Sequence, residues 1–379
     1  MLRLKFSWLN AALLLGFSLL LPTHAQEVTP SEGGMFRGGA AHLGVYSAAP
    51  IIQTPRIRWQ FDIPRPVRTS PAVADGLAVV GSESGTVYAI DVETGEEAWT
   101  FKTAQPVVST AAMVDDVVYF GSNDDNVYAL DAATGEQRWL FETNGDVYSS
   151  PAVVDDTLYI GSRDELLYAL NTADGALLWN YDTGGEVWSS PAVVDGVVYI
   201  GSRGNRVLAL DAETGALLWE FATEGWVDAT PAVTADTVYI GSHDQRFYAL
   251  DAATGDVRWQ TDAGGVVYAS AVVSETMIYV NNFDGALLAL DAATGEQLWS
   301  FDIGAPAYSS PSLVDGVVYV LSEQGGLLYG VDATTGVELW RYQTGQQGDF
   351  RSASPVAVDD TLYIASNTEG LLALVARGR

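Results

Sequence analysis

The sequence predicts an all-β fold, an eight-bladed β-propeller built from four-stranded antiparallel blades. Two observations support this prediction. Tryptophan recurs every 40 residues and, in the last interval, after 41, at Trp59, Trp99, Trp139, Trp179, Trp219, Trp259, Trp299 and Trp340. Each period also contains four short β-rich runs separated by Gly, Asp, Asn and Ser, with no helical periodicity after the N-terminus. A repeat of this length with four strands matches one propeller blade.

The strand counts predict how the ring closes. The second and third strands of the repeat each occur eight times, but the chain ends without a Trp strand after its last copy. The segment Arg56 to Phe61, which carries Trp59, precedes the first complete repeat. We therefore expect this N-terminal strand to complete the last blade, which leaves the sheet with only short, protected edges.

The N-terminal region has the composition of a secretory signal peptide. A basic start with Arg3 and Lys5 precedes an apolar run from Ala11 to Leu21, and a small-residue site ends at Ala25. The run is too short for a membrane span of about 20 residues. The expected domains are a signal peptide at 1–25, a linker or strap at 26–55, and the propeller at 56–379. The sequence leaves open whether 26–55 is a tether or packs on the propeller.

Charge and cysteine content limit the environment and the partners. The formal net charge is −30, and loss of Arg3 and Lys5 with the signal peptide would make it −32. Such acidity disfavours binding to nucleic acid and to anionic lipid. Two explanations account for the excess of acidic residues: a solvated surface, or adaptation to high salt. The sequence has no cysteine, hence no thiol for lipid attachment. We expect an exported, periplasmic or extracellular monomer that is not anchored through cysteine.

An Asp-x-x-Thr-Gly segment precedes six of the Trp strands and invites a calcium interpretation; it begins at Asp91, Asp131, Asp211, Asp251, Asp291 and Asp332. The spacing favours a tight turn instead, because the carboxylate can accept nearby backbone N–H groups while Gly supplies a positive φ. Asn171 replaces the Asp in one copy and can form the same turn. We therefore predict a structural role for these segments and no metal site.

The repeated Tyr-Ala-Leu-Asp-x-x-Thr-Gly-x-x-x-Trp pattern resembles the repeat of pyrroloquinoline-quinone-type, or quinoprotein-like, β-propellers. The segment from Met35 to Tyr46 is similar to the one that precedes the first blade in extracytoplasmic members. The resemblance implies that each repeated Trp wedges between adjacent blades as a structural residue. It implies two classes of function: a quinone-dependent dehydrogenase, or a scaffold such as the propeller subunit of the outer-membrane β-barrel assembly machinery.

The sequence lacks the motifs that mark quinone-dependent dehydrogenases. Vicinal cysteines and the haem motif Cys-x-x-Cys-His are absent, and the repeats contain almost no insertions. We predict no catalytic residues and no cofactor. The function that we predict is a non-enzymatic exported scaffold that binds an envelope protein, in outer-membrane protein assembly. The alternative is a quinone or other small ligand at the channel mouth.

The positions that differ between copies are the candidates for binding. One set precedes each inner strand and is expected near the mouth of the central channel; its members are Arg68, Val108, Tyr148, Trp188, Asp228, Tyr268, Tyr308 and Ser352. A second set follows each Gly-Ser; its positive members are Arg163, Arg203, Arg206, His243 and Arg246. With Trp226, these sets predict an Arg-aromatic patch for a protein partner. The competing interpretations are packing at strand ends and local salt bridges to Glu165, Glu186 and Glu224.

Overall fold

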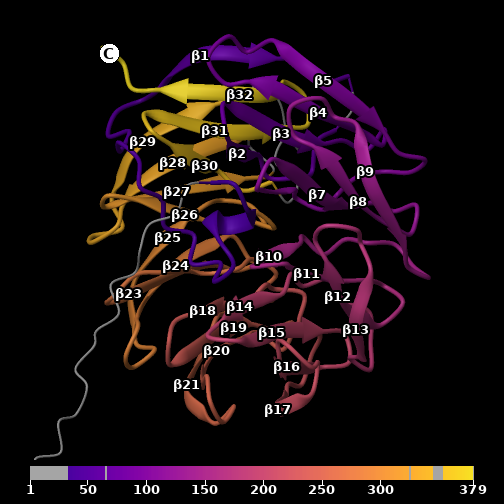
Figure 1. The fold of residues 1–379 in the computed structure, drawn as a ribbon. Helices are drawn as coiled ribbons and strands as arrows, with labels where there is room; N and C mark the ends of the chain where they lie inside the picture. The colour runs from indigo at the N-terminus through magenta and orange to yellow at the C-terminus, as the bar shows by residue number, and fades with distance from the viewer. Residues whose placement is uncertain (1–32, 65, 324–325, 345–352, 379) are drawn as a thin grey trace, which may run out of the picture.

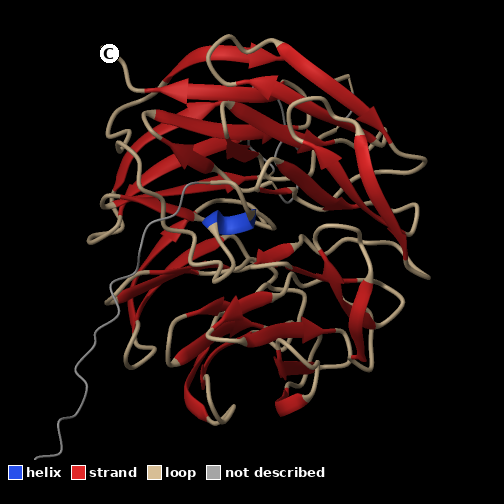
Figure 2. Ribbon diagram, viewed as in Figure 1, coloured by secondary structure: helices blue, strands red, loops and turns tan. Residues whose placement is uncertain are grey.

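The computed structural model describes residues 33–64, 66–323, 326–344 and 353–378. Within these residues, 32 strands form eight antiparallel four-stranded sheets, arranged as blades around a central axis (Figure 1). Figure 2 shows strands throughout and one short 3-10 turn, η1 (Phe36–Gly38), in the middle of the molecule. The predicted all-β, eight-bladed propeller is confirmed. The predicted signal peptide at 1–25 lies outside the described residues.

Each blade runs from an inner to an outer strand, and the inner strands of neighbouring blades contact one another. Blade 1 contains β2 (Ala72–Ala74), β3 (Leu77–Gly81), β4 (Thr86–Asp91) and β5 (Glu97–Lys102). Blade 2 contains β6 (Ala112–Val114), β7 (Val117–Gly121), β8 (Asn126–Asp131) and β9 (Gln137–Glu142). Blade 3 contains β10 (Ala152–Val154), β11 (Thr157–Gly161), β12 (Leu166–Asn171) and β13 (Leu177–Asp182). Blade 4 contains β14 (Ala192–Val194), β15 (Val197–Ser202), β16 (Arg206–Asp211) and β17 (Leu217–Ala222).

The second half of the ring repeats this order. Blade 5 contains β18 (Ala232–Val233), β19 (Thr237–Gly241), β20 (Arg246–Asp251) and β21 (Val257–Asp262). Blade 6 contains β22 (Val272–Val273), β23 (Met277–Asn281), β24 (Ala286–Asp291) and β25 (Gln297–Asp302). Blade 7 contains β26 (Ser312–Val314), β27 (Val317–Ser322), β28 (Leu327–Asp332) and β29 (Glu338–Gln343). Blade 8 contains β30 (Val356–Val358), β31 (Thr361–Ser366), β32 (Gly370–Val375) and, from the other end of the chain, β1 (Arg56–Phe61).

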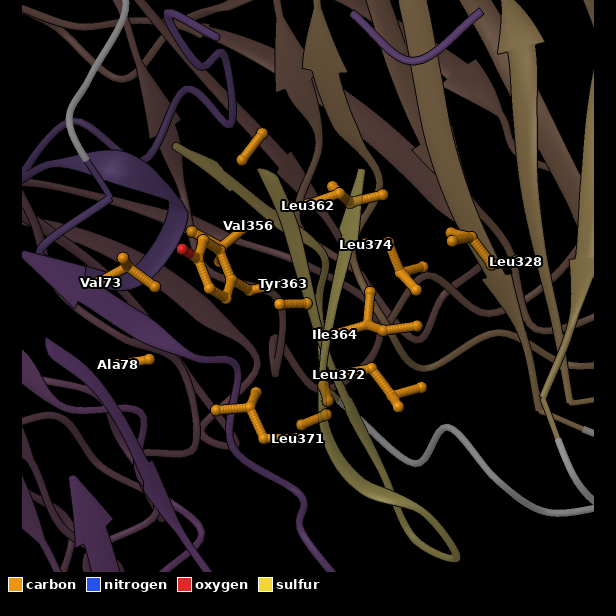
Figure 3. Packing of buried hydrophobic residues seen from close by; sticks show 14 of the residues in the cluster. Val73, Ala78, Leu328, Val356, Leu362, Tyr363, Ile364, Leu371, Leu372 and Leu374 are labelled. Atoms are coloured by element: carbon orange, nitrogen blue, oxygen red, sulfur yellow. The ribbon is translucent and has the colours of Figure 1, made fainter. Parts of the chain in front are cut away.

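Blade 8 closes the ring as predicted. Strand β1 pairs antiparallel with β32, with Trp59 opposite Ala373, and the two lie side by side in Figure 1. Figure 3 shows the apolar residues of β31 and β32, among them Ile364 and Leu372, packed between neighbouring blades. The same buried cluster includes Trp59 and residues of blades 1 and 7. Closure therefore joins the two ends of the chain through both backbone pairing and a shared core.

The repeated tryptophans dock each blade on the next. The Trp179 indole N–H donates to the carbonyl of Ala212 at 3.0 Å, and the equivalent bond recurs from Trp59 through Trp299 at 2.7–3.2 Å. The indole also lies against the glycine of the next blade's turn, so that a Cβ on Gly215 would come within 2.7 Å of Trp179. Each of these seven tryptophans therefore contacts the turn of the following blade.

The Asp-x-x-Thr-Gly segments form the predicted turns. Asp91 Oδ1 accepts hydrogen bonds from the backbone N–H of Glu93 and from both the N–H and the hydroxyl of Thr94, at 2.8–3.0 Å. Gly95 follows with a φ of +72°. The carboxylate is thus used within its own turn.

The segment at 33–51 packs on the propeller as a strap across the inner strands. Its carbonyls accept backbone N–H groups from the second residue of inner strands: Gly33 from Val73, Ala40 from Val193, and Leu43 from Val273. Val45 and Ala48 form isolated bridges with Leu313 and Asp359. For the described part of 26–55, the strap is thus the observed arrangement.

The end of the strap substitutes for a missing blade contact. In blade 8 the fourth strand, β1, does not follow β32 in the chain, so no Asp-x-x-Thr-Gly turn joins these two strands to offer Trp340 the usual carbonyl. Its indole N–H donates instead to the carbonyl of Ile51 at 2.6 Å, and the backbone N–H of Ile51 donates to the Tyr319 hydroxyl at 2.7 Å. The strap therefore completes the contact between blades 7 and 8.

Candidate functional site

A central cavity of about 400 Å³ opens along the propeller axis. Its floor includes Phe36 of the strap. Its wall is formed by the variable residues that precede the inner strands and by a layer of hydroxyl groups below them. The residues that line it are Phe36, Arg68, Val108, Thr110, Tyr148, Ser150, Trp188, Ser190, Arg203, Asp228, Thr230, Tyr268, Ser270, Tyr308 and Ser310. The variable residues that precede the inner strands therefore surround the channel. Ser352, the eighth member of this set, lies outside the described residues.

Eight hydroxyl groups form a closed ring of hydrogen bonds around this cavity. In each blade a backbone N–H donates to the Ser or Thr hydroxyl at the equivalent position of the next blade, and Ser354 donates back to Ser70 across the closure. All eight distances are 2.8–3.1 Å. The donors, in order, are Ser70, Thr110, Ser150, Ser190, Thr230, Ser270, Ser310 and Ser354. The ring fixes the inner strands at a uniform spacing.

Half of the rim above the ring is a continuous stack of aromatic and guanidinium groups. The rings of Tyr148 and Trp188 stack with centroids 4.5 Å apart. The Arg203 guanidinium lies over Trp188 at 3.7 Å and over Trp226 at 4.6 Å. This geometry is favourable for cation–π attraction and holds the rim side chains of blades 3, 4 and 5 together.

The stack continues from blade 5 to blade 7. The His243 ring lies 5.6 Å from Trp226 and 4.3 Å from Tyr268, and Tyr268 lies 5.1 Å from Tyr308. Trp226 remains 47% exposed. We refer to these aromatic and guanidinium side chains, together with the charged side chains that pair along them, as the aromatic arc; its members are Tyr148, Trp188, Arg203, Trp226, His243, Tyr268, Tyr308, Asp146, Arg163, Glu186 and Asp228.

A chain of ion pairs runs along the same arc. Arg163 lies 2.6 Å from Asp146 and 3.3 Å from Glu186. Arg203 contacts Glu186 at 3.3 Å and both oxygens of Asp228 at 2.9 Å. Bidentate geometry of this kind is the strong form of an Arg–carboxylate pair. The charges therefore alternate around the mouth and join blades 3, 4 and 5.

Both central carboxylates are held in the ionised form. Burial acts to raise the Asp228 pKa, but His243, whose Nε2 lies 3.1 Å away, and the hydrogen bonds from Arg203 bring that pKa below its ordinary value. Burial also opposes ionisation of Glu186, whereas the Trp188 indole and Arg163 lower its pKa. The Trp188 N–H donates to Glu186 Oε2 at 2.8 Å. The arc thus combines aromatic surface with fixed negative charge.

Two of the candidate arginines lie apart from this arc. Arg206 begins β16 and pairs with Glu220 on the outer strand at 3.2 Å. Arg246 begins the equivalent strand of blade 5, is exposed, and lies opposite Asp262 in the sheet register. The expected Arg-aromatic patch is therefore built by Arg163 and Arg203 rather than by Arg206 and Arg246. Of the three predicted salt-bridge partners, Glu186 accepts these arginines.

The rim of blade 1 carries a separate ion pair. Arg68 Nε lies 2.5 Å from Glu83 Oε1, four blades away from Asp228 as the repeat predicts. The positive charge of Arg68 is therefore balanced by Glu83 within blade 1.

Below the cavity, the strap buries two polar side chains that sequence analysis did not single out. Arg37 donates to the carbonyls of His42, Pro311 and Ala271, and burial lowers its pKa to about 10. His42 bridges the carbonyls of Phe36 and Pro191 at 2.8 Å, and burial lowers its pKa to about 4. These contacts anchor the floor of the cavity to blades 4, 6 and 7.

The hydroxyl ring, Asp146 and Phe36 were also missed. The ring has a signal in the sequence, because Ser or Thr occupies the same place in all eight copies. Among the described residues, no group of three or more His, Asp or Glu side chains could hold a metal ion. Within the same residues, no helix has the length and apolar character needed to cross a membrane.

Comparisons with known proteins agree with this architecture. The chain superposes on BamB from Moraxella catarrhalis with a TM-score of 0.71 at 20% identity, covering 85% of this chain and 99% of that one. It also superposes on a quinohemoprotein alcohol dehydrogenase from Comamonas testosteroni, with a TM-score of 0.78 at 16% identity and coverage of 92% and 81%. A europium-containing methanol dehydrogenase gives a TM-score of 0.78 at 15% identity, with coverage of 89% and 90%. At these identities the likeness concerns the fold alone.

The family of this chain is identified from its sequence. A comparison with curated protein sequences finds no match. The family model described as outer membrane protein assembly factor BamB, however, matches residues 48–139, 108–188, 182–272 and 262–379, which together span all eight blades. The chain therefore belongs to this family of PQQ-type propeller-repeat proteins.

Proposed function

We propose that the protein is a non-enzymatic, exported β-propeller that binds a protein partner in the cell envelope, in outer-membrane protein assembly. Family membership supports this role, and the predicted signal peptide supports export. The observation that carries the proposal is the aromatic arc. A rigid scaffold presents Trp, Tyr and Arg side chains around one opening, which is the composition enriched at interface hot spots.

The arc is suited to a protein partner because it is pre-organised and only partly covered. Trp188 and Arg203 are fixed by the Glu186 and Asp228 contacts, so little side-chain entropy remains to be lost on binding. Trp226 leaves nearly half of its surface open at the outer side of the stack. A partner that covers it would bury a large aromatic side chain next to an already ordered polar network.

Site-specific photocrosslinking in the native host tests this function. We would place a benzophenone amino acid at Trp226 and, as a matched control, at Leu218, which is 52% exposed on the outer strand of blade 4. We expect position 226 to crosslink to a component of the outer-membrane assembly machinery and position 218 not to. Identical crosslink patterns from both positions, or none from 226, would contradict the proposal.

A second candidate is a small-ligand protein, favoured by the volume of the central cavity. A space of about 400 Å³ with aromatic and hydroxyl walls falls within the range of small-molecule sites. Titration of the purified protein with pyrroloquinoline quinone plus calcium tests this candidate by absorbance and calorimetry. Saturable binding would support it, and the absence of a heat or spectral change would leave the scaffold function.

A further inference from the structure

The aromatic arc carries more negative than positive charge. Its ion-pair chain contains three carboxylates, on Asp146, Glu186 and Asp228, and two guanidinium groups, on Arg163 and Arg203. His243 also lies 3.1 Å from Asp228 and is counted as neutral, as in the formal net charge. Both guanidinium groups are committed to these carboxylates and lie against aromatic rings. The arginines therefore have their charge compensated within the arc, which leaves the mouth with a net negative charge despite its arginine content.

Further carboxylates adjoin the blade 3 end of the arc. Burial raises the pKa of Asp125, and repulsion from Asp146, Asp124 and Asp164 raises it further. Asp124 and Asp164 are fixed by hydrogen bonds from Tyr128 and Tyr168 at 2.9 and 2.6 Å. The negative potential of the mouth therefore extends outward from the stack.

The central cavity below the arc is lined by Ser and Thr hydroxyl oxygens that can accept hydrogen bonds. Each lining Ser or Thr oxygen accepts one backbone N–H from the ring and retains a second lone pair. The Asp228 carboxylate also lines this space. The Tyr268 and Tyr308 rings border the path inward. A long side chain with an apolar stem and a cationic head matches these surroundings.

We propose that the mouth of the propeller accepts an Arg or Lys side chain, carried on a basic loop of the protein partner. The aromatic arc packs on the stem of this side chain, and the carboxylates of the arc and the hydroxyl ring attract its charge. The proposal deepens the scaffold function and rests on it. Charge complementarity supports the choice of partner, because the chain has a net charge of −30 and repels acidic segments.

Calorimetric titration with synthetic peptides tests this inference. The probe is a short peptide of alternating Arg and Ser, compared with peptides that carry Gln or Glu in place of every Arg. We expect the Arg peptide to bind about tenfold more tightly than the Gln peptide, and the Glu peptide not to bind. We also expect binding to weaken as the salt concentration rises.

A pair of double variants separates the mouth from general attraction to an acidic protein. Asp146→Asn with Glu186→Gln removes two charges from the arc. Glu93→Gln with Glu213→Gln removes two charges from exposed turns between third and fourth strands, at the opposite end of the blades. We expect the first variant to weaken Arg-peptide binding about tenfold and the second to leave it within about twofold.

Three outcomes would overturn the inference: equal binding of the Arg and Gln peptides, equal loss in both double variants, or no binding of any peptide. Thermal melts of both variants establish that each is folded before it is titrated. The crosslinking experiment at position 226 does not depend on these titrations. A partner captured there, together with failed titrations, would retain the scaffold function and reject the basic loop.

Discussion

At the scale of single residues, the hydroxyl ring shows how a small side chain can hold a large fold together. Each Ser or Thr oxygen is the acceptor for a buried backbone N–H of the preceding blade. Loss of such an acceptor leaves the N–H without a partner, which costs more than an exposed hydrogen bond contributes. The ring therefore stabilises the fold at the places where adjacent blades approach most closely.

Substitution of Ser190 tests this role. Ser190→Ala removes the acceptor of the Ser150 N–H and should lower the free energy of unfolding by about 1 to 3 kcal/mol. Ser190→Thr is the matched control, because Thr serves at the equivalent positions 110 and 230. Urea denaturation measures both. A control that loses as much stability as Ser190→Ala would show that side-chain fit, rather than the hydroxyl, matters here.

The contact between Trp179 and Gly215 can be isolated with a second glycine. Gly215 and Gly196 have φ values of +71° and +76°, but only at Gly215 would a Cβ meet the indole. Gly196→Ala should cost about 1 kcal/mol from its positive φ alone. Gly215→Ala should cost about 1 to 3 kcal/mol more, from overpacking. Equal losses in chemical denaturation would argue against tryptophan docking as the source of the second cost.

Asp228 should make the rim sensitive to acid. Its folded pKa lies below the ordinary value of 3.8, so its stabilisation is present above that value and is lost as the pH falls through the folded pKa. Asp228→Asn should lower the free energy of unfolding by about 1.5 to 3 kcal/mol near neutral pH. The difference from wild type should shrink below about pH 4. Denaturation curves across this range measure it, and a difference independent of pH would contradict the assignment.

At the scale of elements, the sequence predicted the blades and the closure of the ring but left the arrangement of the strap open. The 40-residue period gave the blade count, and the unpaired strand around Trp59 gave the closure, because each follows from counting. The strap gave no such signal, since it binds the inner strands through backbone carbonyls that any residue possesses. Arg206 belongs with Arg203 to the set that follows each Gly-Ser, but it begins β16 and pairs with Glu220 on the outer strand of its blade.

Removal of the strap tests its contribution. Deletion of residues 1–55 keeps β1 but removes Ile51, the partner of both Trp340 and Tyr319, and all the carbonyls that bind the inner strands. At about 1 kcal/mol for each hydrogen bond, the melting temperature should fall by about 10 °C or more. Deletion of residues 1–61 also opens blade 8 and should have a larger effect. Calorimetry that shows an unchanged melt for the shorter deletion would make the strap dispensable.

At the scale of the whole molecule, charge is the property that the fold leaves least compensated. The sequence contains 48 acidic and 18 basic residues. Many carboxylates are used locally, in turns such as that of Asp91 and in the arc around Asp228. These local contacts do not reduce the net charge, so the folded chain retains a long-range self-repulsion that a compact shape intensifies.

Salt should therefore stabilise the folded protein. Dissolved ions shorten the Debye length from about 30 Å at 0.01 M to about 3 Å at 1 M, which screens repulsion between distant carboxylates while short ion pairs such as Arg203–Asp228 are partly shielded by burial. The melting temperature should rise across this range of sodium chloride near pH 7. The rise should be smaller near pH 4, where carboxylates begin to be protonated, and this comparison separates screening from a general salting-out effect. A melting temperature that is independent of salt near pH 7 would mean that the surface charge is already balanced by its arrangement.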